Sequence, residues 1–249
     1  MPAPAVFLRL SNFSSRSFVK PCILMLALLA SGVLTTEIYA QDATDKRPLT
    51  ISDYQLWRTI SGSRISADGR WAAWTYTRER SDDVVHIKSL NSTSEHVLSP
   101  ATGVELSEDG QWAAYFVDLP FAESEKLRRD GEDVLREAEL INLESGEKLK
   151  WGDVTSFEFS SGSSHFFIKK RQVDEDSDHD GTDLILRNLE EGYEELIGSV
   201  DEAEFNKVGT LFAYSVDAEN KDGNGLYYVN LETGSRRVLD NAKQRYTRL

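Results

Sequence analysis

Apolar and polar residues recur along most of the chain in a unit that predicts antiparallel strands. Each unit opens with a strand, a tight turn and a second strand rich in aromatic and small apolar residues. The copies of this pattern are residues 64–74, 105–115, 158–167 and 204–214. The turn is Asp68-Gly69 in the first copy and Asp109-Gly110 in the second. Gly supplies the positive φ that such turns need and Asp bonds its own backbone, so this pair favours a hairpin.

The second half of each unit predicts two more strands. A strand of alternating apolar and polar residues runs into a polar turn, in residues 85–91, 139–146, 183–192 and 226–234. A short fourth strand follows, such as Arg-Arg-Val-Leu at residues 236–239. Four antiparallel strands in a repeat of about 40–50 residues are typical of a β-propeller blade. An antiparallel sandwich with accidental repeats is the alternative.

We therefore predict an all-β fold, a partial β-propeller of four-stranded antiparallel blades. The innermost strands are expected to end at Ile65, Leu106, Phe159 and Phe205. The blades are expected at about residues 63–99, 103–153, 154–198 and 199–240, and residues 246–249 as the first strand of a fifth blade. Four blades and an orphan strand leave an open sheet edge, which folded proteins avoid. We therefore expect the sequence to be a fragment or a truncated product.

Residues 1–40 predict a secretory signal peptide. Basic residues without an acidic one precede an apolar run at residues 23–34, and Ala40 stands directly before Gln41. This order is typical of a cleaved signal, with the cut between Ala40 and Gln41. The run is short for a membrane span, so we expect an exported protein, periplasmic or secreted, with no membrane contact after cleavage. An uncleaved signal anchor is the alternative.

Two segments lie outside the repeat. Residues 41–62 predict a helical lead-in, with Thr50 and Asp53 as a capping box. The apolar positions of the expected amphipathic helix, which would pack on the propeller, are Tyr54, Leu56, Trp57 and Ile60. Residues 119–137 interrupt the second blade between its second and third strands and are charged and mostly helix-forming. We interpret them as a solvated loop or, alternatively, as a lid or docking element.

The third blade contains an acidic motif that suggests a metal site. Asp176, Asp178 and Asp180 alternate before Gly181, which is a Ca²⁺-loop spacing, and Asp183 adds a further oxygen donor. A helix–loop–helix site is excluded because Arg187 stands where the bidentate Glu would be needed. A hairpin-loop Ca²⁺ site and a solvated acidic hairpin tip remain as the two interpretations. No other cofactor is expected.

Charge and cysteine content exclude several classes of protein. The formal net charge is −14, from 28 Lys and Arg against 42 Asp and Glu. Nucleic-acid binding needs a basic face and is not expected. The single cysteine, Cys22, cannot form an internal disulfide or a Cys-rich zinc site.

The sequence shows no catalytic constellation. Residues 162–166 read Gly-Ser-Ser-His-Phe, in a strand-to-strand turn and without the second Gly of a nucleophile elbow. His165 takes the position of Trp71 and Trp112 in the repeat, which favours packing. Residues 190–195 resemble an acidic pocket for a peptide amine, but their register puts them at an outer hairpin turn, where we expect solvated surface.

Taken together, these motifs make the chain resemble the N-terminal propeller of the prolyl oligopeptidase family of serine peptidases, in its exported, dipeptidyl-peptidase-like bacterial branch. The residues that carry the resemblance are 46–50, Asp53 and Tyr54, Trp57, 60–62, 65–69, 181–184, 186–189 and 205–231. The resemblance implies a propeller of seven or eight blades and an α/β-hydrolase domain with a Ser, Asp and His that cleave peptides. None of those catalytic residues has a counterpart in this sequence.

Two functions follow as expectations. In the first, the chain is the non-catalytic propeller of an exported peptidase, gating access to an α/β-hydrolase domain that the sequence lacks and through which peptide substrate would bind. In the second, it is a stand-alone periplasmic β-propeller used for binding or scaffolding.

Overall fold

The computed structural model describes residues 47–172 and 177–249. The chain divides into two units, Met1–Leu49 and Thr50–Leu249. The predicted signal peptide, its cleavage site at Ala40 and Gln41, and Asp176 of the acidic motif all lie outside the described residues. Within the described residues, no helix is both long and apolar enough to cross a membrane.

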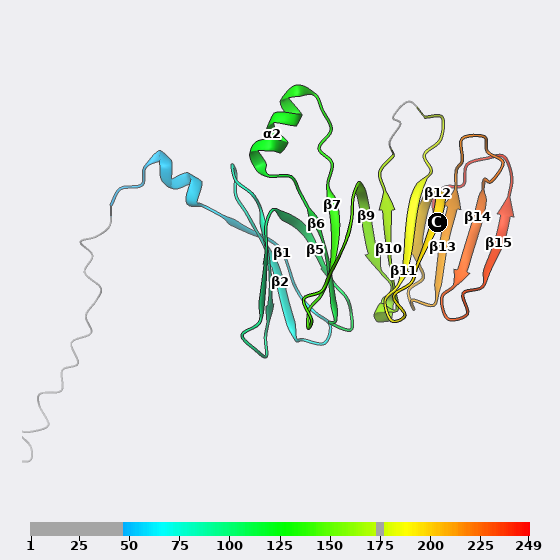
Figure 1. Cartoon of the computed structure of the whole chain (residues 1–249), viewed down its shortest axis with the longest axis horizontal. Helices are drawn as coiled ribbons and strands as arrows, with labels where there is room; N and C mark the ends of the chain where they lie inside the picture. Colours follow the sequence, from blue (N-terminus) through cyan, green and yellow to red (C-terminus); the bar gives the residue numbers. More distant parts are fainter. Residues whose placement is uncertain (1–46, 173–176) are drawn as a thin grey trace, which may run out of the picture. The chain divides into compact units, whose positions relative to one another are not determined.

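The Thr50–Leu249 unit consists of antiparallel strands that hydrogen-bond in sequence order (Figure 1). Blade 1 comprises β1 (Thr59–Ile65), β2 (Trp71–Thr77), β3 (Val84–Ser89) and β4 (Glu95–Leu98). Blade 2 comprises β5 (Ala101–Leu106), β6 (Trp112–Val117), β7 (Glu137–Asn142) and β8 (Lys148–Trp151). A third sheet of seven strands holds β9 (Val154–Phe159), β10 (His165–Lys170), β11 (Thr182–Asn188), β12 (Glu194–Phe205), β13 (Leu211–Val216), β14 (Gly225–Asn230) and β15 (Arg236–Asn241). The predicted all-β fold of four-stranded antiparallel blades is confirmed.

The seven-stranded sheet contains two blades because they share one long strand. Val200 of β12 pairs with Thr182 of β11 on one side and with Val216 of β13 on the other. The first half of β12 is therefore the outermost strand of blade 3, and the second half is the innermost strand of blade 4. Blades 1 and 2 are instead joined through Ser99-Pro100, and blades 2 and 3 through Gly152-Asp153.

The innermost strands β1, β5, β9 and β12 end at Ile65, Leu106, Phe159 and Phe205, as the repeat predicts. In the turn that follows each strand, the fourth residue after the strand end has a positive φ: Gly69 (φ 71°), Gly110 (φ 65°), Ser163 (φ 60°) and Gly209 (φ 68°). In blade 3, Gly162 (φ 75°) has a positive φ as well. The first residue of each turn closes it, because its side-chain oxygen accepts the backbone N–H of the residue five positions later. The Trp71 N–H donates to Ser66 in this way at 2.9 Å. The corresponding hydrogen bonds to Ser107, Ser160 and Asn206 have the same length.

Hydrophobic clusters lie between neighbouring blades, so the blades pack face to face. Trp71 and Ala73 of β2 share a cluster with Tyr115 of β6 and Ile141 of β7. A second cluster joins blades 2 and 3, and a third joins blades 3 and 4. Alternate residues of each second strand thus face opposite neighbours, as the period of two in a strand requires.

Two expectations about the segments around the blades are wrong. The capping box of Thr50 and Asp53 is present, but it begins a short 3₁₀ helix, η2 (Ile51–Leu56), and not an amphipathic helix that reaches Ile60. Ile60 pairs with Tyr76 in β1, because backbone pairing with β2 takes precedence over the helical pattern. Leu56 and Trp57 are exposed. Residues 246–249 form no strand, because no described strand pairs with them.

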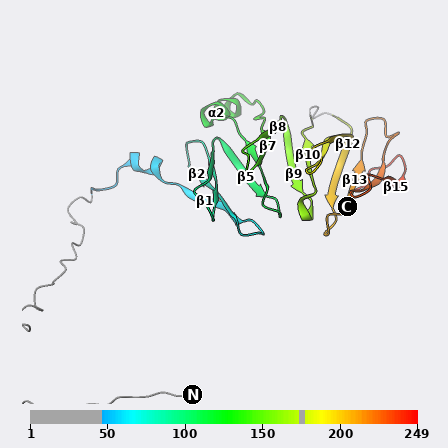
Figure 2. The same ribbon diagram turned by 60° about the horizontal axis from the view of Figure 1, so that its bottom comes forward.

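The insertion in blade 2 forms α2 (Phe121–Asp130), which lies beyond the ends of β6 and β7 in both views (Figures 1 and 2). Gly131 ends the helix in the left-handed conformation at φ 73°. Asp82, in the β2–β3 loop of blade 1, accepts the backbone N–H of Phe121 at 2.6 Å. The start of α2 is thereby tied to the neighbouring blade.

Candidate functional site

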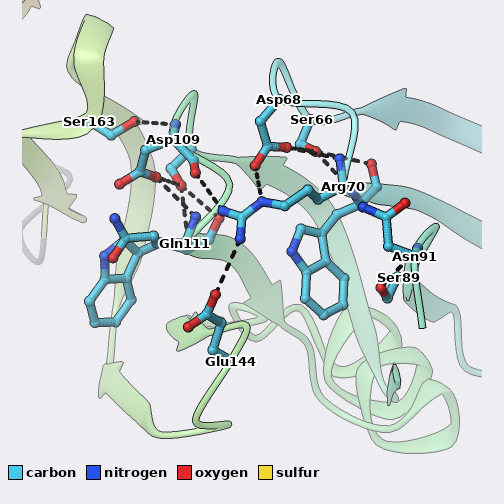
Figure 3. A network of polar contacts seen from close by, with 12 residues as sticks. Ser66, Asp68, Arg70, Ser89, Asn91, Asp109, Gln111, Glu144 and Ser163 are labelled. Carbon is cyan, nitrogen blue, oxygen red and sulfur yellow. Dashed lines mark hydrogen bonds and ion pairs between the residues drawn. The ribbon is translucent and has the colours of Figure 1, made fainter. Parts of the chain in front are cut away.

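The turns after the innermost strands contact one another from blade to blade. Figure 3 shows the guanidinium of Arg70, which donates to the Asp109 carbonyl oxygen at 3.0 Å and to a Glu144 carboxylate oxygen at 3.2 Å, both in blade 2. The Asp109 N–H in turn donates to the Ser163 hydroxyl of blade 3 at 3.2 Å. Polar contacts between consecutive turns therefore connect blades 1, 2 and 3.

Further contacts between the turns join blade 2 to blade 3 and blade 3 to blade 4. The Glu108 carboxylate accepts the Gly162 N–H at 2.6 Å and the Ser161 hydroxyl at 3.2 Å. A Cβ on Gly209 would lie 1.9 Å from the Ser161 carbonyl oxygen, so blades 3 and 4 meet backbone to backbone at this point. The turns thus set the spacing of the blades.

Asp68 is the most strongly perturbed carboxylate of these turns. The Ser66 hydroxyl donates to it at 2.6 Å and the Arg70 N–H at 3.0 Å, and its other oxygen pairs with the Arg70 guanidinium. These hydrogen bonds, that of Ser66 foremost, lower the pKa of Asp68 to about 2. Asp68 is therefore ionised at every physiological pH.

Three carboxylates take equivalent positions on successive innermost strands. Glu105, Glu158 and Glu204, named here the inner carboxylate row, each stand one residue before the strand end. Their opposite residues are Ala114, Phe167 and Ala213, each the third residue of its second strand. The inner carboxylate row therefore lies on the innermost strands of blades 2 to 4, the strands that surround the central channel in a closed propeller.

Burial makes two members of the inner carboxylate row, Glu105 and Glu158, responsive to nearby positive charge. Desolvation raises the pKa of Glu105, and the Arg64 guanidinium at 3.9 Å opposes that shift. Desolvation also raises the pKa of Glu158, and the charges of Glu204 and Glu105 raise it further. A cation placed beside Glu158 would relieve this repulsion. The environment of Glu105 and Glu158 therefore favours a cationic group beside them.

A second polar cluster joins blades 3 and 4 at the base of the acidic loop. Asp201 is buried, and its carboxylate accepts two hydrogen bonds from Arg245, at 2.7 and 3.2 Å. Arg245 also forms an ion pair with Asp180. The Asp180 N–H donates to the buried carboxylate of Asp217 at 3.1 Å, and the Asn224 amide donates to the other oxygen at 2.7 Å.

Two aspartates of the predicted Ca²⁺ loop have different surroundings in the structure. Asp180 is engaged by Arg245, while Asp183 lies in β11 with an exposed side chain. Asp178 is described, and Asp176 is not. Across residues 47–172 and 177–249, no group of three or more His, Cys, Asp or Glu is arranged to hold a metal ion. Ca²⁺ binding by this loop stays a prediction.

The residues excluded from catalysis by sequence lie together beside a hollow of about 550 Å³ that Ser164, His165, Glu190 and Glu191 help to line. His165 is buried as expected, and burial lowers its pKa. Its Nδ1 lies 3.0 Å from the hydroxyl of the adjacent Ser164. The Glu190 and Glu191 N–H groups donate to the Asn188 side chain, which makes this segment a hairpin turn. The turn that holds Ser163 and Ser164 joins β9 to β10, strand to strand, whereas a nucleophile elbow joins a strand to a helix.

Sequence reasoning missed two features of the site. The inner carboxylate row could have been found, because each Glu directly precedes the apolar residue that ends the repeat's first strand. The pair of Arg245 and Asp201 could not, because the two residues are far apart in sequence and no local motif marks them.

Comparison with known proteins finds similar solved structures at low sequence identity. No family model matches the sequence, and no curated protein does. The chain is similar to the β-propeller domain of the Trilobed protease from Pyrococcus furiosus, with 16% identity and a TM-score of 0.47, over 74% of this chain and 58% of that one. It is also similar to Pyrococcus horikoshii acylaminoacyl peptidase, with 15% identity and a TM-score of 0.45, over 76% of this chain and 33% of that one. A third similar structure is TolB from Acinetobacter baumannii, with 11% identity and a TM-score of 0.40, over 74% of this chain and 44% of that one. The chain thus spans less than two thirds of each of these structures.

Proposed function

We propose that this chain is the N-terminal propeller part of an exported serine peptidase of the prolyl oligopeptidase family. In that role it contributes no catalytic residue and controls the access of peptides to an α/β-hydrolase domain. The observation that carries the proposal is the inner carboxylate row on the innermost strands of blades whose motifs resemble that family; in a closed propeller these strands surround the central channel.

The chemistry of the row fits the passage of peptides. A peptide carries a positive charge at its amino terminus and at each Lys or Arg side chain. Carboxylates along a channel attract such groups and raise their local concentration. Glu105 and Glu158 are half-buried, so their charges are screened less than those of fully exposed groups.

Two measurements on the endogenous protein test the assignment. The protein is immunopurified from the exported fraction of its source cells, its intact mass is measured, and it is treated with a fluorophosphonate that labels active serine hydrolases. We expect a labelled protein with a mass well above the 28.1 kDa of this chain. An unlabelled protein with the mass of residues 41–249 would overturn the proposal in favour of a stand-alone binding or scaffolding propeller. Amino-terminal sequencing is expected to begin at Gln41.

The non-catalytic role is tested on the purified chain. It is expected to release no product from dipeptide or Xaa-Pro reporter substrates, and turnover by the pure chain would contradict the proposal. In the labelled peptidase, Glu158→Gln is expected to raise KM for peptides with a free amino terminus and to leave kcat unchanged. Glu147→Gln, at an exposed hairpin turn, is the matched control. An equal KM for Glu158→Gln and the control would remove the inner carboxylate row from substrate access.

A further inference from the structure

The guanidinium of Arg70 shows how a cation is held between two neighbouring blades. Arg70 ends the β1–β2 turn, and it donates to the Asp109 carbonyl oxygen at 3.0 Å and to the Glu144 carboxylate at 3.2 Å, both in blade 2 (Figure 3). Its Nε pairs with the Asp68 carboxylate of its own turn. Acceptors from two turns and a hairpin thus surround one guanidinium in the groove between blades 1 and 2.

The groove between blades 3 and 4 repeats this arrangement without the arginine. Ser164 holds the position of Arg70, because each directly precedes the second strand of its blade. Val208 is the third residue after the end of β12, as Asp109 is after β5. Glu232 is the second residue after the end of β14, as Glu144 is after β7. A carbonyl oxygen and a carboxylate are therefore retained at these positions, while the cation is replaced by a short hydroxyl side chain.

The hairpins that carry the two glutamates have the same conformation. The N–H groups of Glu144 and Glu232 each donate, at 3.1 Å, to the Asn side chain two residues earlier. The preceding residues, Leu143 and Leu231, donate their N–H groups to the inner turn of the same blade at 2.8 and 2.9 Å. Each hairpin is therefore fixed on the turn of its own blade in the same way.

A hollow of about 550 Å³ lies in the groove between blades 3 and 4, and Val208 is part of its wall. Glu190, Glu191 and Glu232 also line it, and none of its described lining residues is Lys or Arg. Within residues 47–172 and 177–249 these three carboxylates form no ion pair, whereas Glu144 pairs with Arg70. The hollow thus combines the size of a small-molecule site with negative charge that the surrounding chain does not neutralise.

A buried imidazole in the wall of this hollow has an unused nitrogen. His165 is 4% exposed, and its Nδ1 lies 3.0 Å from the Ser164 hydroxyl. In the described part of the chain its Nε2 has no hydrogen-bond partner, which is uncommon for a buried polar atom. Burial lowers the pKa of His165, so the ring is neutral at physiological pH and does not repel a cation. It is also smaller than Trp71 and Trp112, which take its position in blades 1 and 2.

We propose that the groove between blades 3 and 4 binds an external guanidinium group, in the place that Arg70 takes between blades 1 and 2. Glu232 and the Val208 carbonyl oxygen would accept its hydrogen bonds, and Glu190 and Glu191 would add negative charge from blade 3. A guanidinium is planar and directs five N–H donors outward, so it can reach acceptors on both walls, whereas an ammonium is a compact point charge. The ligand class includes a peptide arginine and a free alkylguanidine.

An NMR titration of the full chain tests the proposal, because it follows each backbone amide separately. Nα-acetyl-arginine amide represents a peptide arginine, agmatine represents a free alkylguanidine, and Nα-acetyl-citrulline amide is an uncharged control of similar shape. We expect saturable shifts of the Val208 and Thr233 amides with both guanidinium probes and none with the citrulline probe. The probe with the lower Kd identifies the source of the ligand.

Substitutions on the hairpins test which carboxylate holds the ligand. Glu232→Gln should raise the Kd about fivefold, which corresponds to the loss of one exposed ion pair. Glu147→Gln, on the exposed β7–β8 hairpin of blade 2, is the matched control and should leave the Kd unchanged. Both positions are exposed, so neither substitution is expected to alter folding.

Moving the arginine between the two grooves gives a reciprocal test. Ser164→Arg places a guanidinium where we propose the ligand binds, so the probes should no longer shift the Val208 and Thr233 amides. Arg70→Ser makes the first groove resemble the second, so the arginine probe should now shift the Asp109 and Ser145 amides. The Tm of each variant establishes that it is folded before it is titrated.

Four results would overturn the proposal: no shift with either guanidinium probe, an equal response to the citrulline probe, a Kd that Glu232→Gln leaves unchanged, or binding that persists in folded Ser164→Arg. The site does not depend on the peptidase assignment. A protein that fails to react with fluorophosphonate would leave both walls of the groove as they are.

Discussion

A Cβ on Gly209 would lie 1.9 Å from the carbonyl oxygen of Ser161. This separation is far inside van der Waals contact, and the obstacle is backbone from another blade, which a rotamer change cannot remove. Gly209 also has a φ of 68°, which costs a side-chain-bearing residue roughly 1–2 kcal/mol. The glycine is therefore needed for conformation and for blade spacing at once.

Gly209→Ala is expected to destabilise the fold by at least twice the cost of Gly146→Ala. Gly146 has a similar φ of 75°, but a Cβ there would meet nothing within 4 Å, so its substitution costs backbone strain alone. The free energies of unfolding of the two variants in urea measure the difference. Equal losses would mean that the contact between Gly209 and Ser161 does not fix the spacing of blades 3 and 4.

Asp68 is expected to make stability depend on pH in the acid range. Because its folded pKa is lowered from 3.8 to about 2 by the Ser66 hydroxyl and the Arg70 N–H, its contribution is present above about pH 4 and is lost as the pH falls through about 2. Asp68→Asn should lower Tm at neutral pH and flatten the dependence of Tm on pH between about 4 and 2.

Glu147→Gln is the control for this series, since it removes an exposed carboxylate of another turn. The control should keep the acid dependence of the original chain. A Tm profile of Asp68→Asn that runs parallel to the original down to pH 2 would show that the Ser66 and Arg70 hydrogen bonds do not stabilise the turn through the ionised carboxylate.

Asp201 and Asp180 bind the same arginine, and we expect very different costs for their removal. Asp201 is buried and accepts two hydrogen bonds from Arg245, so Asp201→Ala should cost about 2 kcal/mol. The Asp180 side chain is 57% exposed, and Asp180→Ala should cost less than about 1 kcal/mol. Urea unfolding of both variants gives the comparison, and an inverted order would contradict the dominance of the buried pair.

Calcium is expected to raise the Tm of the chain if the acidic loop binds it, and Asp178→Ala should abolish the rise. Arg245 competes for Asp180 in the present structure, so Arg245→Gln should increase the calcium response by freeing a ligand. Differential scanning calorimetry with and without millimolar Ca²⁺ measures both effects. A Tm that calcium leaves unchanged in the original chain and in Arg245→Gln would end the metal prediction.

The blades could be predicted because their signals are local. The side chains of Ser66 and Ser107 close their turns on residues five positions later, and Gly69 and Gly110 provide the left-handed backbone. The residues involved are at most five positions apart in sequence, so the residue types of one short segment are enough to predict where the strand ends. Ser160 and Asn206 close their turns in the same way, which explains why the weaker copies of the motif form equivalent turns.

The remaining features depend on contacts that no short segment encodes. The apolar spacing of Tyr54, Leu56, Trp57 and Ile60 fits a helix, yet Ile60 joins β1 because β2 offers it a hydrogen-bonding partner. The hydrogen bond from Arg245 to Asp201 likewise joins residues that are far apart in sequence. Burial raises the pKa values of Glu105 and Glu158, and charges on neighbouring blades raise that of Glu158 further; a single repeat can reveal neither effect.

The continuous β12 restricts how this repeat can be rearranged in evolution. A blade can be duplicated or deleted cleanly where the chain leaves one sheet before it enters the next, as at Ser99-Pro100 and Gly152-Asp153. Between blades 3 and 4, any such exchange must cut a strand whose Val200 is paired on both sides. Blades 3 and 4 would therefore be inherited, gained or lost as a single module, while blades 1 and 2 remain separately exchangeable.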